Sequence, residues 1–417
     1  MNRSWRKTGS SEPLTLLDIG TSKVVAMIVA ETEFGWRLVG FGHQRSRGLK
    51  AGVIVDLDAV EETVRATLNQ AEQMAGIHVE DVRVAVACGR LKSLNFTARA
   101  DAGDGIVQDD DIARVMHAGR VYAERDGRCL LSMNRIGWRL DGVGGIIDPV
   151  GLAARRIAAE LHAVTADDAP LRNILNCLER CRLTTTQLSV TAHASALAVT
   201  SDDDRNLGVT VVDMGGGVTS IAEFMEGHLI GVHAIPVGGS HITFDIARAL
   251  STPVAEAERI KTLHGTLALA HSDAHEVLSF QHVNGDDVSQ SEIGKSELKD
   301  IILVRVDAIL SLVVERLDIA ATVSAAPSRI VLTGGASEMV GLAAHAAEIL
   351  GRPTRVGRPY GFAGMPDSIC GPAFATVVGL LPLALDPEAS SMGLGDDGAM
   401  AGDGYLGRVG RWIKESF

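Results

Sequence analysis

Two segments of the chain repeat one short pattern, and this repeat restricts the possible folds more than any other feature. LTLLDIGTSKVV occupies residues 14–25, and VTVVDMGGGVTS occupies residues 209–220. Each has an apolar run, an aspartate, an apolar residue, a glycine and a turn of small residues, and a second apolar run follows. The pattern predicts two β-hairpins. Because their aspartates lie 195 residues apart, it also predicts two domains of similar design that face each other.

The residue types in both turns suit a phosphate ligand. Glycine lets backbone N–H groups approach a phosphate without a Cβ in the way. Thr21 and Ser22 add hydroxyl donors to the first turn. Asp18 and Asp213, at the two strand ends, can hold a hydrated Mg²⁺ that bridges phosphate oxygens. One such hairpin alone is usually an ordinary turn, so the prediction rests on the pair.

A third segment, IVLTGGASEMVGL at 330–342, has the pattern of a strand, a Gly-Gly turn and a helix. Taken alone, it fits a plain strand-to-helix turn in which Ser337 caps the helix. In this order and spacing behind the two hairpins, it favours a nucleotide site. The three segments together predict an ATP site between two domains.

Composition excludes several classes of protein. The 417 residues are 46% hydrophobic and 22% charged, which is typical of a globular chain long enough for two or three domains. No stretch offers the ~18 uncharged apolar residues of a membrane-spanning helix. Residues 1–12 form a basic leader with no apolar run behind it, unlike a signal peptide. The net charge of −13 argues against a nucleic-acid partner.

Strand-like and helix-like runs alternate along the chain, which predicts an α/β fold. A turn-rich middle marks 81–163 as an inserted small domain. Strands are expected over 14–20, 23–30, 82–88, 186–192, 209–215, 219–225 and 329–335, and helices over 58–75, 109–118, 149–161, 170–181, 241–250, 253–264, 295–319, 337–350 and 372–381.

The last part of the chain changes character. Residues 386–404 carry five acidic residues and no basic ones, and they predict a flexible linker with a span of about 25 Å. On a helical wheel, residues 405–417 separate into an apolar arc of about 140° and a mostly basic side. The apolar arc holds Tyr405, Leu406, Val409, Trp412, Ile413 and Phe417, and the other side holds Arg408, Arg411, Lys414 and Glu415.

A helix of this length, about 20 Å, is too short to span a bilayer. It can lie in the interface, with its apolar face inserted and its cations on anionic lipid headgroups. The alternative is that it docks on the protein's own core or on a partner. The acidic linker and the tryptophan flanked by basic residues favour the membrane.

The three motifs, in this order, resemble those of the actin/Hsp70/sugar-kinase ATPase superfamily, and within it the FtsA family of actin-like cell division proteins. The resemblance covers roughly residues 14–385 and the terminal segment. It implies an actin-like ATPase fold, with two facing RNase H-like domains and an FtsA-type inserted subdomain. The matching segments are LDIGTSKV, 207–224, 235–250, 330–342 and 371–381, with GIIDPVGL and ELHAVTAD in the inserted part.

The family pattern also implies domain limits. The first actin-like domain would comprise 13–80, 164–206 and 368–385, and the inserted subdomain 81–163. The second domain would comprise 207–240 and 325–367, with a small helical subdomain over 241–324. The leader at 1–12, the linker at 386–404 and the amphipathic segment at 405–417 complete the division.

Carried over by resemblance, the site binds ATP and Mg²⁺. Asp18 and Asp213 would hold the magnesium through water. Glu258 and Lys261 would touch the ribose and base, although on the residues alone they fit a solvated helix face equally well. The phosphate loops would comprise Gly20, Thr21, Ser22 and Lys23, and Gly215, Gly216 and Gly217, while Gly334 and Gly335 would pass under the adenosine.

The chain departs from the family pattern at two places. Ser220 replaces the usual aspartate after the second phosphate turn. The stretch 190–199 lacks the glutamate with which many polymerising relatives catalyse hydrolysis, and His193 is its only titratable side chain. General-base catalysis contributes ~10²–10⁴-fold, so its absence predicts slow hydrolysis, with nucleotide setting conformation more than driving turnover.

The resemblance implies a role as a membrane tether at the cytoplasmic face of the inner membrane, at the division septum. The expected partners are the C-terminal tail of FtsZ, later division proteins, anionic membrane lipid and further copies in actin-like filaments. Arg305 matches an arginine that the family uses for the FtsZ tail, and its alternative is an ordinary surface arginine. The alternative functions are a PilM-like interaction module of pilus assembly and a small-molecule kinase.

Overall fold

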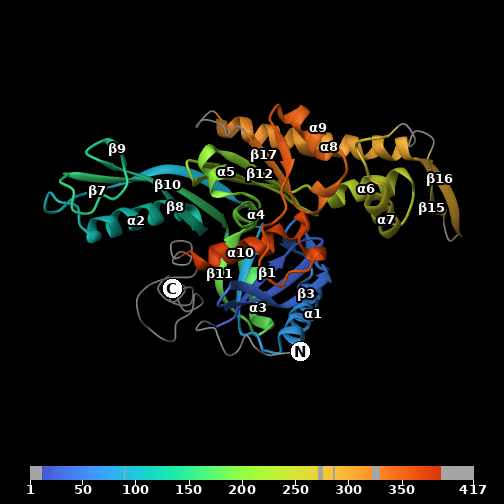
Figure 1. The fold of residues 1–417 in the computed structure, drawn as a ribbon, viewed down its shortest axis with the longest axis horizontal. Coiled ribbons are helices and arrows are strands. Elements are labelled where there is room, and N and C mark those ends of the chain that lie inside the picture. The colour runs from blue at the N-terminus through green and yellow to red at the C-terminus, as the bar shows by residue number, and fades with distance from the viewer. Residues whose placement is uncertain (1–11, 89, 271–275, 285–286, 322–328, 387–417) are drawn as a thin grey trace.

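The computed structural model describes residues 12–88, 90–270, 276–284, 287–321 and 329–386. Two halves lie one above the other, with helices α4 and α10 between them (Figure 1). A small subdomain projects from one side, and a helical subdomain projects from the other. The α/β prediction is confirmed, and each of the seven expected strands is present within two residues of its predicted start.

Each half is built on a five-stranded sheet. The first sheet has the order β11-β6-β1-β2-β3, and the second has the order β14-β13-β12-β17-β18. The first consists of β1 (Leu14–Ile19), β2 (Lys23–Thr32), β3 (Gly35–Arg45), β6 (Asp81–Val86) and β11 (Thr184–Val190). The second consists of β12 (Val209–Met214), β13 (Thr219–Met225), β14 (His228–Ile235), β17 (Arg329–Thr333) and β18 (Thr354–Val356).

Two helices join the sheets at the centre of the molecule. α4 (Thr191–Val199) packs on β12 and β13, and α10 (Ala375–Leu385) packs on β1 and β6. The helices contact each other closely, because a Cβ on Gly379 would lie 1.7 Å from the carbonyl oxygen of Ala194. Only a glycine permits this approach, and it brings the two halves together around one central contact.

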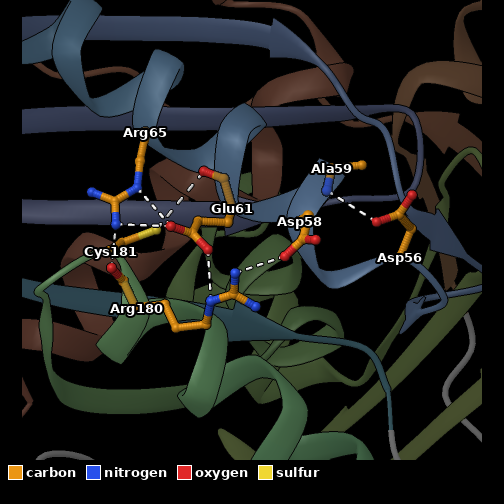
Figure 2. A network of polar contacts seen from close by, with 7 residues as sticks. All are labelled: Asp56, Asp58, Ala59, Glu61, Arg65, Arg180 and Cys181. Atoms are coloured by element: carbon orange, nitrogen blue, oxygen red, sulfur yellow. Dashed lines mark hydrogen bonds and ion pairs between the residues drawn. The ribbon is translucent and has the colours of Figure 1, made fainter.

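The outer face of the first sheet carries α1 (Leu57–Ala75) and α3 (Asp168–Arg180). Figure 2 shows the polar network that joins them, in which Arg180 pairs with Asp58 at 2.6 Å and with Glu61 at 2.7 Å. Half-exposed pairs of this kind contribute at most about 1 kcal/mol each. The buried side chains of Leu171 and Ile174 therefore supply most of what holds α3 in place.

The small subdomain lies between β6 and α3 in the sequence and forms its own four-stranded sheet, of order β7-β10-β8-β9. It comprises β7 (Lys92–Asp101), α2 (Asp109–Ala123), β8 (Arg128–Leu140), β9 (Val143–Ile146) and β10 (Arg156–Asp167). The helix expected over 149–161 is wrong, since residues 156–161 begin β10. This strand lies between β7 and β8, and its residues are buried in alternation from Ile157 to Leu161. Pairing on both sides has overridden the helical propensity of RIAAEL.

The same subdomain is bonded to the edge of the second sheet. Asn95 on β7 donates a hydrogen bond to the Ile230 carbonyl on β14 at 2.8 Å. The Val232 amide donates to the Ser93 hydroxyl at 3.1 Å, and that hydroxyl lies 2.7 Å from Nε2 of the buried His162. Two backbone groups of an edge strand are thereby paired with side chains of the insertion.

The helical subdomain lies between β14 and β17 and shares a core with the second sheet. It comprises α6 (Gly239–Ala249), α7 (Val254–His264), the hairpin of β15 (Val277–Asn284) and β16 (Asp287–Gly294), and α8 (Lys295–Ala321). The helix expected from residue 337 begins instead at Leu342, as α9 (Leu342–Leu350), because Gly341 adopts φ +85° and residues 335–338 form a separate 3-10 turn. None of the helices in the described ranges is both long and apolar enough to span a membrane.

Candidate nucleotide-binding site

A cavity of about 520 Å³ lies where the two halves face each other. Its walls come from both hairpins, from the start of α6, from α7 and from the turn after β17. The structure brings together every residue that the sequence predicts for the nucleotide. These are Asp18, Gly20, Thr21, Ser22, Lys23, Asp213, Gly215, Gly216, Gly217, Glu258, Lys261, Gly334 and Gly335.

The two hairpin turns have the same internal hydrogen bond and touch each other across the cavity. The Gly20 amide donates to the Lys23 carbonyl, and the Gly215 amide donates to the Val218 carbonyl, both at 3.0 Å. A Cβ on Gly216 would lie 2.5 Å from the Ser22 hydroxyl oxygen. At Gly217 it would lie 2.7 Å from the Thr21 hydroxyl oxygen. Glycine therefore keeps the two turns in contact and leaves backbone on the cavity wall, which suits an anionic ligand.

The start of α6 supports the second turn. The Gly239 amide donates to the Gly215 carbonyl at 2.9 Å, and the Ser240 amide donates to the Gly216 carbonyl at 2.8 Å. Gly239 and Ser240 themselves line the cavity, so the amino end of α6 lies at its wall. A helix amino terminus favours negative charge, and this adds to the preference for a phosphate.

Two carboxyl groups, the partly buried Asp18 and the buried Asp213, lie at the ends of the paired strands. The pKa of Asp18 is raised to about 7, mainly because of burial; Lys23 opposes the shift, and the charge of Asp213 adds a smaller increase. Burial also raises the pKa of Asp213, which accepts hydrogen bonds from Ser195 and from Thr376, the latter at 3.2 Å. Lys23 therefore compensates the two carboxyl groups only in part, and burial outweighs its charge.

The donor set fits magnesium held by phosphate and water. Within the described ranges, no three His, Cys, Asp or Glu side chains come close enough to form a protein cage for a metal ion. Mg²⁺ usually keeps several waters and takes one or two carboxylates together with substrate phosphates. Asp18 and Asp213, on opposite hairpins at one cavity, match that requirement.

Glu258 and Lys261 lie on the α7 side of the cavity and already form an ion pair, with Nζ 2.7 Å from the Glu258 carboxylate. Burial alone would raise the pKa of Glu258. Hydrogen bonds from Lys261 and Thr243 outweigh it and lower that pKa. Lys261 also donates to the Thr243 hydroxyl at 2.8 Å. The pair is therefore a fixed polar element of the wall.

Gly334 lies against Asp213, whereas the sequence predicts only that it passes under the adenosine. It adopts φ +81° and ψ 160°, and a Cβ there would lie 2.2 Å from the Asp213 carboxylate. At Gly335, by contrast, a Cβ would meet only the Ala373 methyl group at 3.7 Å. The first of these glycines is required by the backbone and by Asp213, and the second is not.

The sequence patterns do not mark three further residues at this site. Glu338 and Thr376 line the cavity, and Ser195 of α4 bonds to Asp213. Thr376 comes from a helix 163 residues beyond Asp213, and Ser195 comes from α4, outside the hairpin pattern, so the spacing within the hairpins marks neither of them. The GG pair at 238–239, within a segment that carries the family resemblance, was the available signal for the start of α6.

The two departures from the family pattern have clear places. Ser220 pairs with Asp213 across the second hairpin and lines the cavity. His193 is not among the lining residues. Its ring packs against Phe224 at 5.8 Å, and burial lowers its pKa to about 4. His193 is therefore neutral near pH 7 and is turned to the core.

The other predicted site residues do not share this cavity. Arg305 of α8 donates to Asp245 of α6 at 2.5 Å, and its side chain is 31% exposed. The predicted membrane segment lies outside the described residues, with Leu406, Val409, Trp412, Ile413, Phe417, Arg408, Arg411 and Lys414.

Comparisons with known proteins identify the family. The model of the cell division protein FtsA matches residues 210–379, and that of the SHS2 domain inserted in FtsA matches residues 88–165. The chain is 38% identical over 421 residues to the cell division protein FtsA of Rhizobium meliloti (strain 1021), which covers 98% of this chain and 95% of that one. With FtsA of Escherichia coli (strain K12) it is 30% identical over 410 residues, covering 96% and 97%.

The chain belongs to the FtsA family of cell division proteins. Solved structures agree on the fold. A chain of the PilM-PilN type IV pilus biogenesis complex aligns with a TM-score of 0.64 at 17% identity, covering 90% of this chain and 99% of that one. MreB 5 of Spiroplasma citri bound to AMPPNP aligns with a TM-score of 0.55 at 14% identity, covering 98% and 100%. The predicted actin-like ATPase fold with the FtsA-type insertion is confirmed.

Proposed function

We propose that this FtsA-family protein binds ATP and tethers polymers of FtsZ to the cytoplasmic face of the inner membrane at the division septum. The observation that carries the proposal is the cavity between the two hairpins, in a chain of this family. By the same resemblance, the protein self-associates into actin-like filaments and recruits later division proteins.

The proposed ligand is ATP with Mg²⁺. The two glycine turns and the start of α6 would bind the phosphates, and Glu258 and Lys261 would lie beside the sugar and base. Bound Mg²⁺ would neutralise phosphate charge. Asp18 and Asp213 would hold its waters. The MreB 5 structure with the same fold was solved with AMPPNP, which supports a nucleotide here.

Hydrolysis in this site would be slow. α4 presents only Thr191 to the cavity, and His193 is turned away from it. The acidic side chains of the wall are Asp18, Asp213, Glu258 and Glu338, and none of them comes from α4. We infer that the nucleotide fixes how the two halves meet, through hairpins that are already in contact.

The proposed membrane element is segment 405–417. Its apolar arc would enter the headgroup region, and Arg408, Arg411 and Lys414 would face anionic lipid. The linker at 386–404 would separate this element from the folded body.

The proposed site for the FtsZ tail includes Arg305. Its guanidinium is partly exposed and has one carboxylate neighbour, Asp245. A carboxylate of an acidic peptide could share this arginine, because a guanidinium offers several donors in one plane. The exposed Val304 and Phe244 lie next to these two residues in sequence and would add apolar contact.

Co-sedimentation with anionic liposomes tests the proposal. The chain should sediment with liposomes alone and should bring FtsZ with it, and ATP should change the amount. Trp412→Glu should abolish liposome binding, because it puts a charge into the apolar arc. Arg411→Glu should only weaken binding and make it more salt-sensitive, since each basic residue contributes ~1 kcal/mol. A chain that captures no FtsZ and no lipid would instead favour an interaction module of the PilM kind.

A further inference from the structure

An apolar groove lies beside the central helices α4 and α10, apart from the nucleotide cavity. Its volume is about 460 Å³. Its walls are formed by the turn between β2 and β3, by residues 360–363, by α4 and by α10. Its lining includes four aromatic side chains, from Phe34, Trp36, Tyr360 and Phe362. The whole chain has only 9 Phe, 4 Trp and 3 Tyr, so a quarter of its aromatic residues meet in this one place.

The groove is open to solvent at its rim. Phe34 is 89% exposed and Tyr360 is 60% exposed, while Leu381 at the bottom is 7% exposed. An aromatic rim over a buried apolar floor is the form of a site that receives an amphipathic helix. Glu33 and Arg37 beside the rim carry opposite charges and are both exposed, so apolar contact and not net charge would hold an occupant.

We propose that this groove binds the chain's own segment 405–417 when no membrane is present. The wall of the groove formed by α10 includes Leu381 and Pro382, and α10 ends at Leu385. The chain therefore leaves the groove's edge directly into the linker at 386–404. A linker of 19 residues has a span of about 25 Å, which covers the return to the groove. It would hold the segment at an effective concentration on the order of 1 mM.

The chemistry of the segment matches the groove. Its apolar arc carries Trp412 and Ile413 side by side, with Val409 one turn before and Phe417 one turn after. These side chains suit an aromatic groove as well as they suit a lipid interface. The segment lies outside the described residues, and the groove, its short distance along the chain and the sequence of 405–417 support the match.

Docking and membrane insertion would exclude each other, because both use the same apolar arc. With a groove dissociation constant on the order of 0.1 mM, tethering would lower the apparent lipid affinity roughly 10-fold. The groove would then keep the segment covered until an anionic surface outcompetes it. This consequence rests on the proposed membrane function, but the docking itself does not.

Photocrosslinking in the full chain tests the docking without lipid. A benzophenone amino acid replaces Ile413, and mass spectrometry locates the crosslinks. We expect crosslinks within one monomer to residues 34–36, 360–363 or 378–382. Tyr360→Glu should reduce their yield at least 5-fold. Ile147→Glu, at a residue that is 91% exposed on the small subdomain, is the matched control and should leave the yield unchanged.

Three outcomes would overturn the inference. Crosslinks outside the groove would place the segment elsewhere, and a yield that Tyr360→Glu leaves unchanged would remove the groove from the contact. Crosslinks that appear only between two chains would make the groove an interface between copies.

Liposome titration of the same variants separates this inference from the proposed function. Tyr360→Glu should bind anionic vesicles several-fold more tightly than the parent chain, because the competing site is lost, and Ile147→Glu should match the parent. Crosslinking in the groove without any vesicle binding would contradict the membrane tether and leave the docking intact. Vesicle binding that Tyr360→Glu does not change would contradict the competition.

Discussion

The two halves of the molecule have the same frame but differ in what surrounds their aspartates. Starting from the outer edge, the strand orders are β3-β2-β1-β6-β11 and β14-β13-β12-β17-β18, with the same sequence of antiparallel and parallel pairs. Asp18 pairs in register with Ala85, and Asp213 pairs with Thr333. The aspartates are therefore equivalent in the backbone.

Their neighbours are not equivalent. Asp213 accepts hydrogen bonds from Ser195 and Thr376 and lies against Gly334, whereas the position equivalent to Gly334 in the first half is Val86. Asp18 has Lys23 as the main compensating charge. We infer that a repeated frame has acquired two different roles. The first hairpin brings positive charge to the cavity, and the second supplies a carboxylate held by fixed donors.

The strongest test of this comparison is to remove each carboxylate. Asp213→Ala and Asp18→Ala should each weaken Mg²⁺-dependent ATP binding by roughly 10- to 100-fold, the usual effect of losing a group that orients metal-bound water. Titration calorimetry with ATP, with and without Mg²⁺, measures this. Wild-type affinity in both variants would contradict the proposed site between the halves.

The second test concerns the glycine that only the second half has beside its aspartate. Gly334→Ala should destabilise the fold by about 1 to 3 kcal/mol, because its backbone conformation is almost restricted to glycine, and should weaken ATP binding by displacing Asp213. Gly335→Ala is the matched control, since a Cβ there makes only an ordinary contact. Thermal unfolding and ATP titration of the two variants should separate them, and equal behaviour would contradict the geometry.

The sequence predicts features that depend on residues close together in the chain, and it does not predict features that depend on contacts between distant segments. The hairpins at Asp18 and Asp213 are local, so spacing alone located them. The insertion depends on pairing between β7 and β10, where Lys92 lies opposite Thr165, and no local pattern records such a partner. The same reason explains why the first half of β10, within 149–161, is predicted as helix and why Thr376 is not predicted beside Asp213.

The third test uses the other difference between the halves, at the outer edges of the sheets. The edge of β3 bonds to a loop through Leu38 and Ala363, whereas the edge of β14 bonds to the insertion next to His162. Burial, with smaller effects from His193 and His233, lowers the pKa of His162 to about 3, and its Nδ1 atom has no hydrogen-bond partner among the residues that the structure describes.

Between about pH 6.5 and pH 3, His162 is therefore neutral in the folded chain, whereas the same side chain takes up a proton in the unfolded chain. Stability should be fully present above pH 6.5 and should fall as the pH drops from about 6.5 towards 3, by about 2 kcal/mol at pH 5 from this one group. His162→Gln should reduce the difference in unfolding free energy between pH 7.5 and pH 5, measured with urea. His117→Gln, on the exposed face of α2, is the control. An unchanged difference in His162→Gln would contradict the neutral buried histidine.

The smallest expected effect comes from making Asp213 more like Asp18. Thr376→Val removes a hydroxyl donor from the Asp213 carboxylate and keeps the shape of the side chain. One hydrogen bond to a charged group is worth about 1.5 to 3 kcal/mol, and because Ser195 remains we expect the lower end of that range, a fall in ATP affinity in Mg²⁺ of roughly 10-fold. Thr376→Ser keeps the donor and should bind ATP like the parent chain. Among the described residues, no side-chain hydroxyl donates to Asp18. The comparison therefore requires that Thr376→Val have no effect on a chain that already carries Asp213→Ala, and a further loss of affinity in that double variant would mean that Thr376 acts on the nucleotide directly.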